Sequence, residues 1–211
     1  MIYLIGSHAK FKDIKTLILN KIVFENFSLE ISLFDALVIT SKNSINALKF
    51  NKILPDKNIE IYAIGKASAD AAKKFGFSKI YTAKNMHGDE FATEILPLLA
   101  QKRVLFLRAF KTASSVFEIL HTNNINVEQV IAYKNIPKTL TSTKKPPQGS
   151  ILIFTAPSAV RNFKENFGWE ISYKTVAIGN TTAKELQDLT TPIISSAQNL
   201  KDCIKLAKTL L

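Results

Sequence analysis

A strand–turn–helix pattern that occurs twice constrains the fold of this chain more than any other feature. The segment LVITSKN at 37–43 is matched by LIFTAPS at 152–158, and AIGKAS at 63–68 is matched by AIGNTT at 177–182. In each copy a short apolar run leads into a polar turn, and a pattern with the helical repeat follows. Two copies indicate two similar domains, because a solenoid needs at least three repeats to bury a continuous core.

Strand and helix patterns alternate along the rest of the chain. Apolar runs predict strands at 2–5, 37–39, 60–64, 104–107 and 127–133, and periodicity predicts helices at 13–21, 44–50, 65–72, 90–99 and 115–120. Capping-box patterns begin at Ser115 and at Thr182. This alternation is typical of α/β proteins, so we expect two similar Rossmann/flavodoxin-like domains with parallel sheets.

Two segments mark where the chain passes between the domains. Residues 137–149 contain three prolines and no apolar periodicity, which predicts a loop, and a second crossing is expected near 27–33. Two crossings imply that one domain is inserted in the other. We expect residues 1–32 plus 132–211 to form a discontinuous domain and residues 33–131 to form the inserted one.

The composition excludes several classes of protein. The 211 residues are 46% hydrophobic, which excludes a disordered chain, and no apolar run approaches the roughly 20 residues that span a bilayer. A single cysteine, Cys203, excludes an internal disulfide, and the scattered histidines His8, His87 and His121 argue against a zinc site. The first basic residue follows the apolar N-terminal run, which is the wrong order for a secretory signal. We expect a cytoplasmic protein without a metal.

The formal net charge of +11 favours an acidic partner, although a lysine-rich composition alone would also produce it. Arg103, Arg108 and Arg161 are the only arginines among 28 basic residues, and no basic run or recognition motif is present. We therefore expect neither a nucleic-acid nor a membrane partner, and a nucleic-acid binder would reveal itself by salt-sensitive retention on DNA. A polyanionic small molecule also fits the charge.

Four polar turns follow predicted strands, at the position where α/β sheets bind ligands. Each turn leads into a helix whose first N–H groups are unpaired and carry partial positive charge, which suits a ligand with several carboxylates. Each turn alone could simply cap its helix, with the glycines permitting tight turns, but the duplication of the whole set favours binding. The candidate substrate-binding residues are Thr40, Ser41, Asn43, Gly65, Lys66, Ser68, Thr155, Ser158, Gly179, Thr181 and Thr182.

Taken in order, these segments resemble the uroporphyrinogen-III synthase family. The resemblance runs from about Leu37 to the C-terminus and includes VLFLRA at 104–109 and the strand that ends in Tyr133. No single motif is specific, whereas the order and spacing together are. The family has two α/β domains, one inserted in the other, joined by a hinge of two strands, and it uses neither a metal nor an organic cofactor.

The resemblance implies a cyclising hydro-lyase of tetrapyrrole (heme) biosynthesis, which we expect to be a monomer. Members take hydroxymethylbilane, a linear tetrapyrrole with eight carboxylates, and eliminate water from its hydroxymethyl group. The substituted carbon of ring D attacks the resulting azafulvene, and a spiro intermediate opens and recloses as uroporphyrinogen III with ring D inverted. Uncatalysed closure gives the uninverted isomer, so the task is largely conformational control.

The resemblance also assigns roles to residues. Tyr133 matches the family's tyrosine at the end of the last inserted-domain strand, where a phenol could assist departure of the hydroxyl, and Thr181 and Thr182 match a Thr-Thr pair at the substrate cleft. The alternative for Tyr133 is packing between the domains with its hydroxyl in water. The departures from the family pattern are Asn180 for proline, Ala109 for glycine and Ala156 for serine.

A non-catalytic interpretation stays open at this point. The same two-domain architecture could serve a binding or sensor protein for an anionic metabolite. Neither a dinucleotide fingerprint, nor a Walker loop, nor a nucleophile elbow occurs in the sequence, so we expect no organic cofactor in either case.

Overall fold

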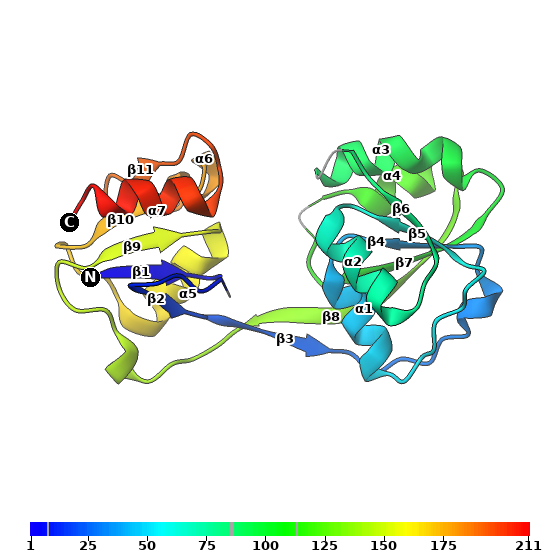
Figure 1. Ribbon diagram of the computed structural model, residues 1–211, viewed down its shortest axis with the longest axis horizontal. Helices are drawn as coiled ribbons and strands as arrows, with labels where there is room; N and C mark the ends of the chain where they lie inside the picture. The colour runs from blue at the N-terminus through cyan, green and yellow to red at the C-terminus, as the bar shows by residue number, and fades with distance from the viewer. Residues whose placement is uncertain (8, 85–86, 113) are drawn as a thin grey trace. The chain divides into compact units, whose positions relative to one another are not determined.

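The chain folds into two compact α/β units. The computed structural model describes residues 1–7, 9–84, 87–112 and 114–211. Unit 1 comprises Met1–Lys21 and Ile136–Leu211, and unit 2 comprises Ile22–Asn135 (Figure 1). None of the helices in these described stretches is both long and apolar enough to cross a membrane.

In the described part of unit 2, six strands form one sheet in the order β3-β8-β7-β4-β5-β6. The strands are β3 (Asn20–Phe24), β4 (Ala36–Ile39), β5 (Glu60–Ala63), β6 (Lys79–Thr82), β7 (Arg103–Ala109) and β8 (Asn126–Pro137). The helices are α1 (Lys42–Phe50), α2 (Lys66–Phe75), α3 (Gly88–Leu99) and α4 (Val116–Thr122), with a 3-10 turn at Ile31–Leu33. Among β4, β5, β6, β7 and β8, every pair of neighbouring strands is parallel.

The alternation of side chains along the strands gives unit 2 two apolar layers. Leu37 and Ile39 of β4 pack in a cluster with α1 and α2, whereas Ala36 and Val38 pack in a second cluster with α3 and α4. The two helix pairs are visible on opposite faces of the sheet in Figure 1. A strand buried on both faces explains why its sequence is a continuous apolar run.

In the described part of unit 1, five strands form a parallel sheet in the order β2-β1-β9-β10-β11. The strands are β1 (Ile2–Ile5), β2 (Ile14–Leu17), β9 (Ile151–Phe154), β10 (Lys174–Ala177) and β11 (Ile193–Ile194). The helices are α5 (Pro157–Phe167), α6 (Asn180–Lys184) and α7 (Leu200–Lys208), with a 3-10 turn at Ser142–Lys144 inside the predicted loop. Residues of α5 and α6 pack on one face, and Cys203 and Ala207 of α7 pack on the other.

The two sheets have the same arrangement with a different chain order. The order in unit 1 is the flavodoxin-like 2-1-3-4-5. In unit 2, β8, β7, β4, β5 and β6 occupy the places that β2, β1, β9, β10 and β11 occupy in unit 1. The strands that open unit 1 therefore correspond to those that close unit 2.

The chain crosses between the units within β3 and β8, at residues 21–22 and 135–136. The first boundary therefore lies before the expected one at residue 32, and the second lies after the expected one at residue 131. The side chains of Ile22, Phe24, Phe27 and Leu29 explain the first difference, because all four pack against the core of unit 2.

The prediction of a helix at 13–21 is wrong, since this segment forms β2 and the start of β3. Ile14 and Leu17 are buried at the two ends of β2, a spacing that a helix would also produce. Asp13 has φ = 64°, which breaks any helix at that point, and Ile14 and Thr16 favour a strand.

The two predicted capping boxes do not form either. Ser115 precedes α4 but its side chain makes no capping bond, and its backbone N–H donates to Asp89 Oδ1 at 2.8 Å. Thr182 is the third residue of α6, and the cap of that helix is Gly179. The scattered histidines are expected to be surface or loop residues; His87 and His121 are exposed, while His8 lies outside the described residues.

Candidate functional site

The candidate residues gather at the carboxyl edge of each parallel sheet. In unit 2 the neighbouring strands β4, β5, β7 and β8 run in the same direction, so their carboxyl ends share one edge. Thr40, Ser41, Asn43, Gly65, Lys66 and Ser68 lie just beyond these ends, and Tyr133, inside β8, pairs with Ala109 at the end of β7. In unit 1 the residues after β9 and β10 are Thr155, Ser158, Gly179, Thr181 and Thr182.

The turn after β4 presents the first set of donors. Ser41 caps α1, and its hydroxyl oxygen accepts a hydrogen bond from the Asn43 backbone N–H at 3.2 Å. Thr40, Ser41 and Asn43 are all partly exposed. Lys42 begins the helix and its side chain is exposed, which adds positive charge to the helix N-terminus.

Tyr133 lies in β8, and its side chain neighbours Ser41 in the turn after β4. The residue is 6% exposed and packs in the cluster of α1 and α2, and Ser41 is its polar neighbour. Burial raises the pKa of the Tyr133 phenol above its usual value of 10.0, and the Ser41 side chain partly offsets this increase. The phenol is therefore protonated at neutral pH and is available as a hydrogen-bond donor.

The turn after β5 is built around Gly65, which caps α2 without a side chain. Lys66 is strongly exposed and forms only a 3.6 Å ion pair with Asp70, which leaves it free to contact an anion. Ser68 is buried at 5% exposure in the first turn of the helix, and its N–H donates to the Gly65 carbonyl.

The turn after β9 offers fewer groups than its counterpart after β4. Ala156 caps α5 with no side-chain bond, and Pro157 has no N–H to give. The exposed Ser158 is therefore the first residue of this helix that can present both a backbone N–H and a hydroxyl. Thr155 uses its hydroxyl within the protein, where Oγ1 donates to the Ile5 carbonyl at 3.1 Å.

The turn after β10 repeats the geometry of the turn after β5. Gly179 has φ = −174° and ψ = 177°, and Gly65 has φ = −174° and ψ = 171°, both in extended conformations that any residue adopts. Tight turning is thus not the reason for these glycines. A side chain at Gly179 would only reach ordinary contact with Gln198, so what glycine supplies is an uncovered backbone beside the exposed Thr181. The hydroxyl residue in the first turn, here Thr182, is again buried.

Two further groups at this edge were not identified from the sequence. Ligands of doubly wound sheets bind where the direction of the chain connections reverses, which is between β1 and β9 in unit 1 and between β7 and β4 in unit 2. Gly6 follows β1 with φ = +82°, and the buried Ser44 bonds to the Leu107 carbonyl at 2.7 Å. Only the strand order, which the sequence does not reveal, would have pointed to these positions.

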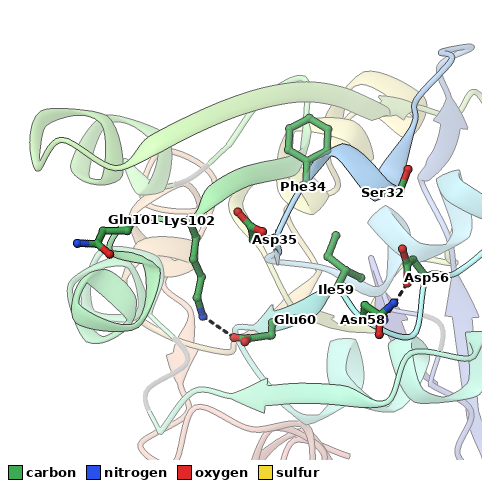
Figure 2. Close-up of a pocket in the computed structure, with 9 residues that line it drawn as sticks. All are labelled: Ser32, Phe34, Asp35, Asp56, Asn58, Ile59, Glu60, Gln101 and Lys102. Atoms are coloured by element: carbon green, nitrogen blue, oxygen red, sulfur yellow. Dashed lines mark hydrogen bonds and ion pairs between the residues drawn. The ribbon is translucent and has the colours of Figure 1, made fainter.

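A hollow of about 450 Å³ lies at the opposite edge of the unit 2 sheet (Figure 2). Asp35 and Lys102 precede β4 and β7, and Glu60 begins β5, so the hollow is at the amino ends of these strands. Bonds from Lys102 Nζ at 2.6 Å and from the Tyr62 hydroxyl at 2.7 Å lower the pKa of Glu60. The carboxylates of this hollow do not suit a polyanion, and we do not include it in the candidate site.

The chemistry of the candidate site is that of hydrogen-bond donors. Among the described residues, no group of three or more histidine, cysteine, aspartate or glutamate side chains could hold a metal ion. The turns combine helix N-termini, hydroxyls and a protonated phenol, which can bind carboxylates and give a proton to a leaving group.

Comparisons with known proteins agree with this chemistry. The family described as uroporphyrinogen-III synthase HemD matches residues 15–205. The crystal structure of uroporphyrinogen-III synthetase from Helicobacter pylori is similar over 100% of this chain and 99% of that chain, with 32% identity and a TM-score of 0.83. A mutant uroporphyrinogen III synthase from the extremely thermophilic bacterium Thermus thermophilus shares the fold at 15% identity and a TM-score of 0.54, over 94% of this chain and 90% of that one. No curated protein matches the sequence. The chain therefore belongs to the uroporphyrinogen-III synthase family, whose members are cyclising lyases of heme biosynthesis.

Proposed function

We propose that this protein converts hydroxymethylbilane to uroporphyrinogen III. The overall change is loss of one water and closure of the ring with ring D inverted. Membership of the family supports the reaction, and the observation that carries the assignment to this edge is the contact between Tyr133 and Ser41, which joins a proton donor to a helix N-terminus. A polyanionic substrate also suits a chain with a formal net charge of +11.

Each unit offers the substrate carboxylates the helix N-termini and hydroxyls of two turns. The helix N-termini capped by Gly65 and Gly179 and the exposed Ser158 and Thr181 supply donors in both units. Lysines such as Lys66 add attraction at longer range, which depends on ionic strength. Distributed contacts of this kind hold a flexible linear tetrapyrrole in one folded conformation, and that conformation selects the isomer.

Tyr133 gives its proton to the departing hydroxyl. The Ser41 oxygen accepts from the Asn43 N–H and keeps its own proton, which it can offer to the neighbouring Tyr133 oxygen. The proton of Tyr133 is then left for the substrate. Transfer of this proton to the hydroxymethyl oxygen, as the C–O bond breaks, releases water and leaves the N-protonated azafulvene, whose new double bond uses the electron pair of the pyrrole nitrogen. The proton that the ring carbon loses on closure returns to the Tyr133 phenolate.

We also propose a monomeric cytoplasmic enzyme without a metal or organic cofactor. The hydrogen-bond donors of the turns and the proton of Tyr133 supply the chemistry that the reaction needs. Cys203, the single cysteine of the sequence, is buried in unit 1 and is therefore not placed to bind a metal at the surface or to link two copies of the chain. Sedimentation of the purified protein at several concentrations tests the monomer. Unchanged turnover after dialysis against a chelator is expected, and restoration of lost activity by a divalent ion would contradict the proposal.

Product analysis tests the reaction itself. The purified protein is supplied with freshly generated hydroxymethylbilane, and the type I and type III uroporphyrinogens are separated after oxidation. We expect faster closure and mainly the type III isomer. A mixture identical to that of the reaction without protein would favour a binding or sensor protein instead.

A further inference from the structure

Each unit has a hydroxyl that ties together the two strands at the reversal point of its sheet. In unit 1, Thr155 Oγ1 donates to the Ile5 carbonyl at 3.1 Å, and in unit 2, Ser44 Oγ donates to the Leu107 carbonyl at 2.7 Å. Ile5 and Leu107 are the same position in the two sheets, since Ile5 pairs with Phe154 and Leu107 pairs with Ile39. The acceptor position is the same in the two units, but the donor position is not.

The two donors come from different positions of the repeated segment. Thr155 corresponds to Thr40, and Ser44 corresponds to Ala159, four residues further along in each copy. In unit 1 the bond is therefore made from the turn, whereas in unit 2 it is made from the first turns of the helix. Thr40 makes no hydrogen bond through its hydroxyl to any residue that the structure describes, and it is partly exposed.

A hydroxyl has a single proton, which decides what each threonine can offer a carboxylate. Thr155 has given its proton to the Ile5 carbonyl and can only accept a further hydrogen bond. An ionised carboxylate donates none, so it gains nothing from the Thr155 hydroxyl. Thr40 has kept its proton and can donate it.

Gly6 lies beside both Thr155 and Ala159 in unit 1. Its φ of +82° turns the chain sharply after β1, and a Cβ built there would lie 2.7 Å from Ala159 Cβ and 3.2 Å from Thr155 Oγ1. The helix thus approaches the turn closely at Ala159, and Thr155 reaches the carbonyl from beside it. This contact fixes the Ile5–Gly6 turn at the ligand-binding edge of unit 1.

We propose that Thr155 is a positioning residue that holds the Ile5–Gly6 turn, and that Thr40, its counterpart in unit 2, is the threonine whose hydroxyl donates to a substrate carboxylate. The proposal rests on the function proposed above only for its kinetic part. The bond between Thr155 and Ile5 has a consequence for stability that does not depend on the substrate.

Four variants test the proposal: Thr155→Val, Thr155→Ser, Thr40→Val and Thr40→Ser. Urea unfolding gives the stability of each, and turnover of hydroxymethylbilane is measured at a temperature where all are folded. Thr155→Val should raise the unfolding equilibrium constant about tenfold, the effect of one lost internal hydrogen bond, and Thr155→Ser should restore it. Thr40→Val should leave that constant within about twofold of wild type but raise KM several-fold with little change in kcat, and Thr40→Ser should restore KM.

A transplanted hydroxyl separates positioning from general destabilisation. The double variant Thr155→Val/Ala159→Ser removes the hydroxyl at 155 and adds one at 159, the position equivalent to Ser44 in unit 2. We expect this double variant to regain stability and kcat/KM relative to Thr155→Val, because the turn is held again although position 155 has no hydroxyl. Ala159→Ser alone is the control for the added oxygen.

Two results would overturn the proposal. Wild-type stability of Thr155→Val with a raised KM would make Thr155 a substrate ligand, and wild-type KM in Thr40→Val would remove Thr40 from the binding groups. If no variant or wild-type protein turns over hydroxymethylbilane, the proposed reaction fails while the stability comparison still decides the role of Thr155.

Discussion

The two units share a sheet arrangement, yet they differ in where their polar groups are used. Within the described residues, the Thr40 hydroxyl of unit 2 has no hydrogen-bond partner, and Ser41 neighbours the phenol of Tyr133. Unit 1 uses Thr155 internally and carries Ala156 and Pro157 at the start of α5, so its exposed hydroxyls are those of Ser158 and Thr181. Both units thus offer hydroxyls, but the phenol of the candidate site belongs to unit 2.

The two copies of the repeated unit keep the same strand arrangement at the carboxyl edge of the sheet, but their hydroxyl groups make different hydrogen bonds there. Both reversal points need a bond between neighbouring strands, and each unit makes that bond with the hydroxyl it has in reach. The hydroxyl that remains is then available for a ligand. Equivalent residues of the two units, such as Thr155 and Thr40, differ in whether they still have a proton to donate. Their roles are therefore assigned from their hydrogen-bond partners.

The largest effect is expected at Gly6, whose close approach to α5 is a feature of unit 1. Gly6→Ala should lower the free energy of unfolding by about 2–4 kcal/mol, since it adds a left-handed residue and a Cβ only 2.7 Å from Ala159 Cβ. Gly149→Ala is the control, because Gly149 has φ = +72° but open space around it, and should cost about 1–2 kcal/mol. Equal losses in urea unfolding would show that the approach of the helix is unimportant.

Ser44→Ala removes the equivalent bond from unit 2. Ser44 is fully buried and its bond to the Leu107 carbonyl is 2.7 Å long, so we expect a loss of about 1–3 kcal/mol in chemical denaturation. Ser78→Ala breaks a 3.0 Å bond to the Lys57 carbonyl at an exposed site and should change stability by less than about 0.5 kcal/mol. A Ser44 variant as stable as the Ser78 variant would contradict the need for a bond at both reversal points.

Tyr133→Phe tests whether unit 2 supplies the proton. We expect turnover to fall by about ten- to a hundredfold, the lower end of general acid assistance because the pyrrole already activates the leaving group. The fold and the preference for type III product should persist. Tyr62→Phe is the matched control, since Tyr62 is a buried tyrosine bonded to Glu60 at the opposite edge of the same sheet. Wild-type turnover in Tyr133→Phe would return this residue to a packing role.

The pH dependence gives a smaller and more specific effect. Burial raises the pKa of Tyr133 above 10.0, so the folded protein holds this proton more tightly than the unfolded chain. Its contribution to stability is complete below about pH 10 and is lost as the pH rises through the folded pKa. Turnover that depends on the proton should be level through neutral pH and decline above about pH 10, and Tyr133→Phe should lack that decline. A decline shared by both proteins would have another cause.

The smallest effect is expected at Thr182, which occupies the same helical position in unit 1 as Ser68 in unit 2. Because Gly179 and not Thr182 caps α6, Thr182→Ala should cost about 1 kcal/mol or less, through lost packing. Ser68→Ala, at the equivalent buried position of α2, should behave alike. Thermal unfolding measures both variants. A much larger loss of stability in Thr182→Ala than in Ser68→Ala would show that the two positions are not equivalent.

Much of the fold could be predicted from the sequence because strands buried on both faces leave continuous apolar runs. Such runs predict β4 and β9, and the polar turns that follow them lie at the predicted strand ends. The prediction for 13–21 is wrong because the spacing of Ile14 and Leu17 suits either a helix or a short strand. Pairing with β1 decides between the two, and that pairing is a tertiary contact.

The use of each hydroxyl could not be predicted for the same reason. Whether Thr155 donates to a carbonyl or to a ligand depends on the position of Ile5, which is brought to it by the pairing of β1 with β9. Gly6 has a packing role that appears only when α5 lies beside it. The contact of Tyr133 with Ser41 likewise joins β8 to the turn after β4.

The permuted strand order has a consequence for how the chain can be divided. Apart from β3, which has no counterpart in the unit 1 sheet, the chain up to α3 contains β1, β2, β4, β5 and β6, and from β7 onward it contains β7, β8, β9, β10 and β11. With β3 left aside, each half is thus a full set of the five strand types, yet each sheet takes two of these strands from one half and three from the other. The two halves exchange their first pair of strands, as in a domain swap made within one polypeptide. A cut between α3 and β7 would leave two fragments that rebuild these sheets only by folding around each other.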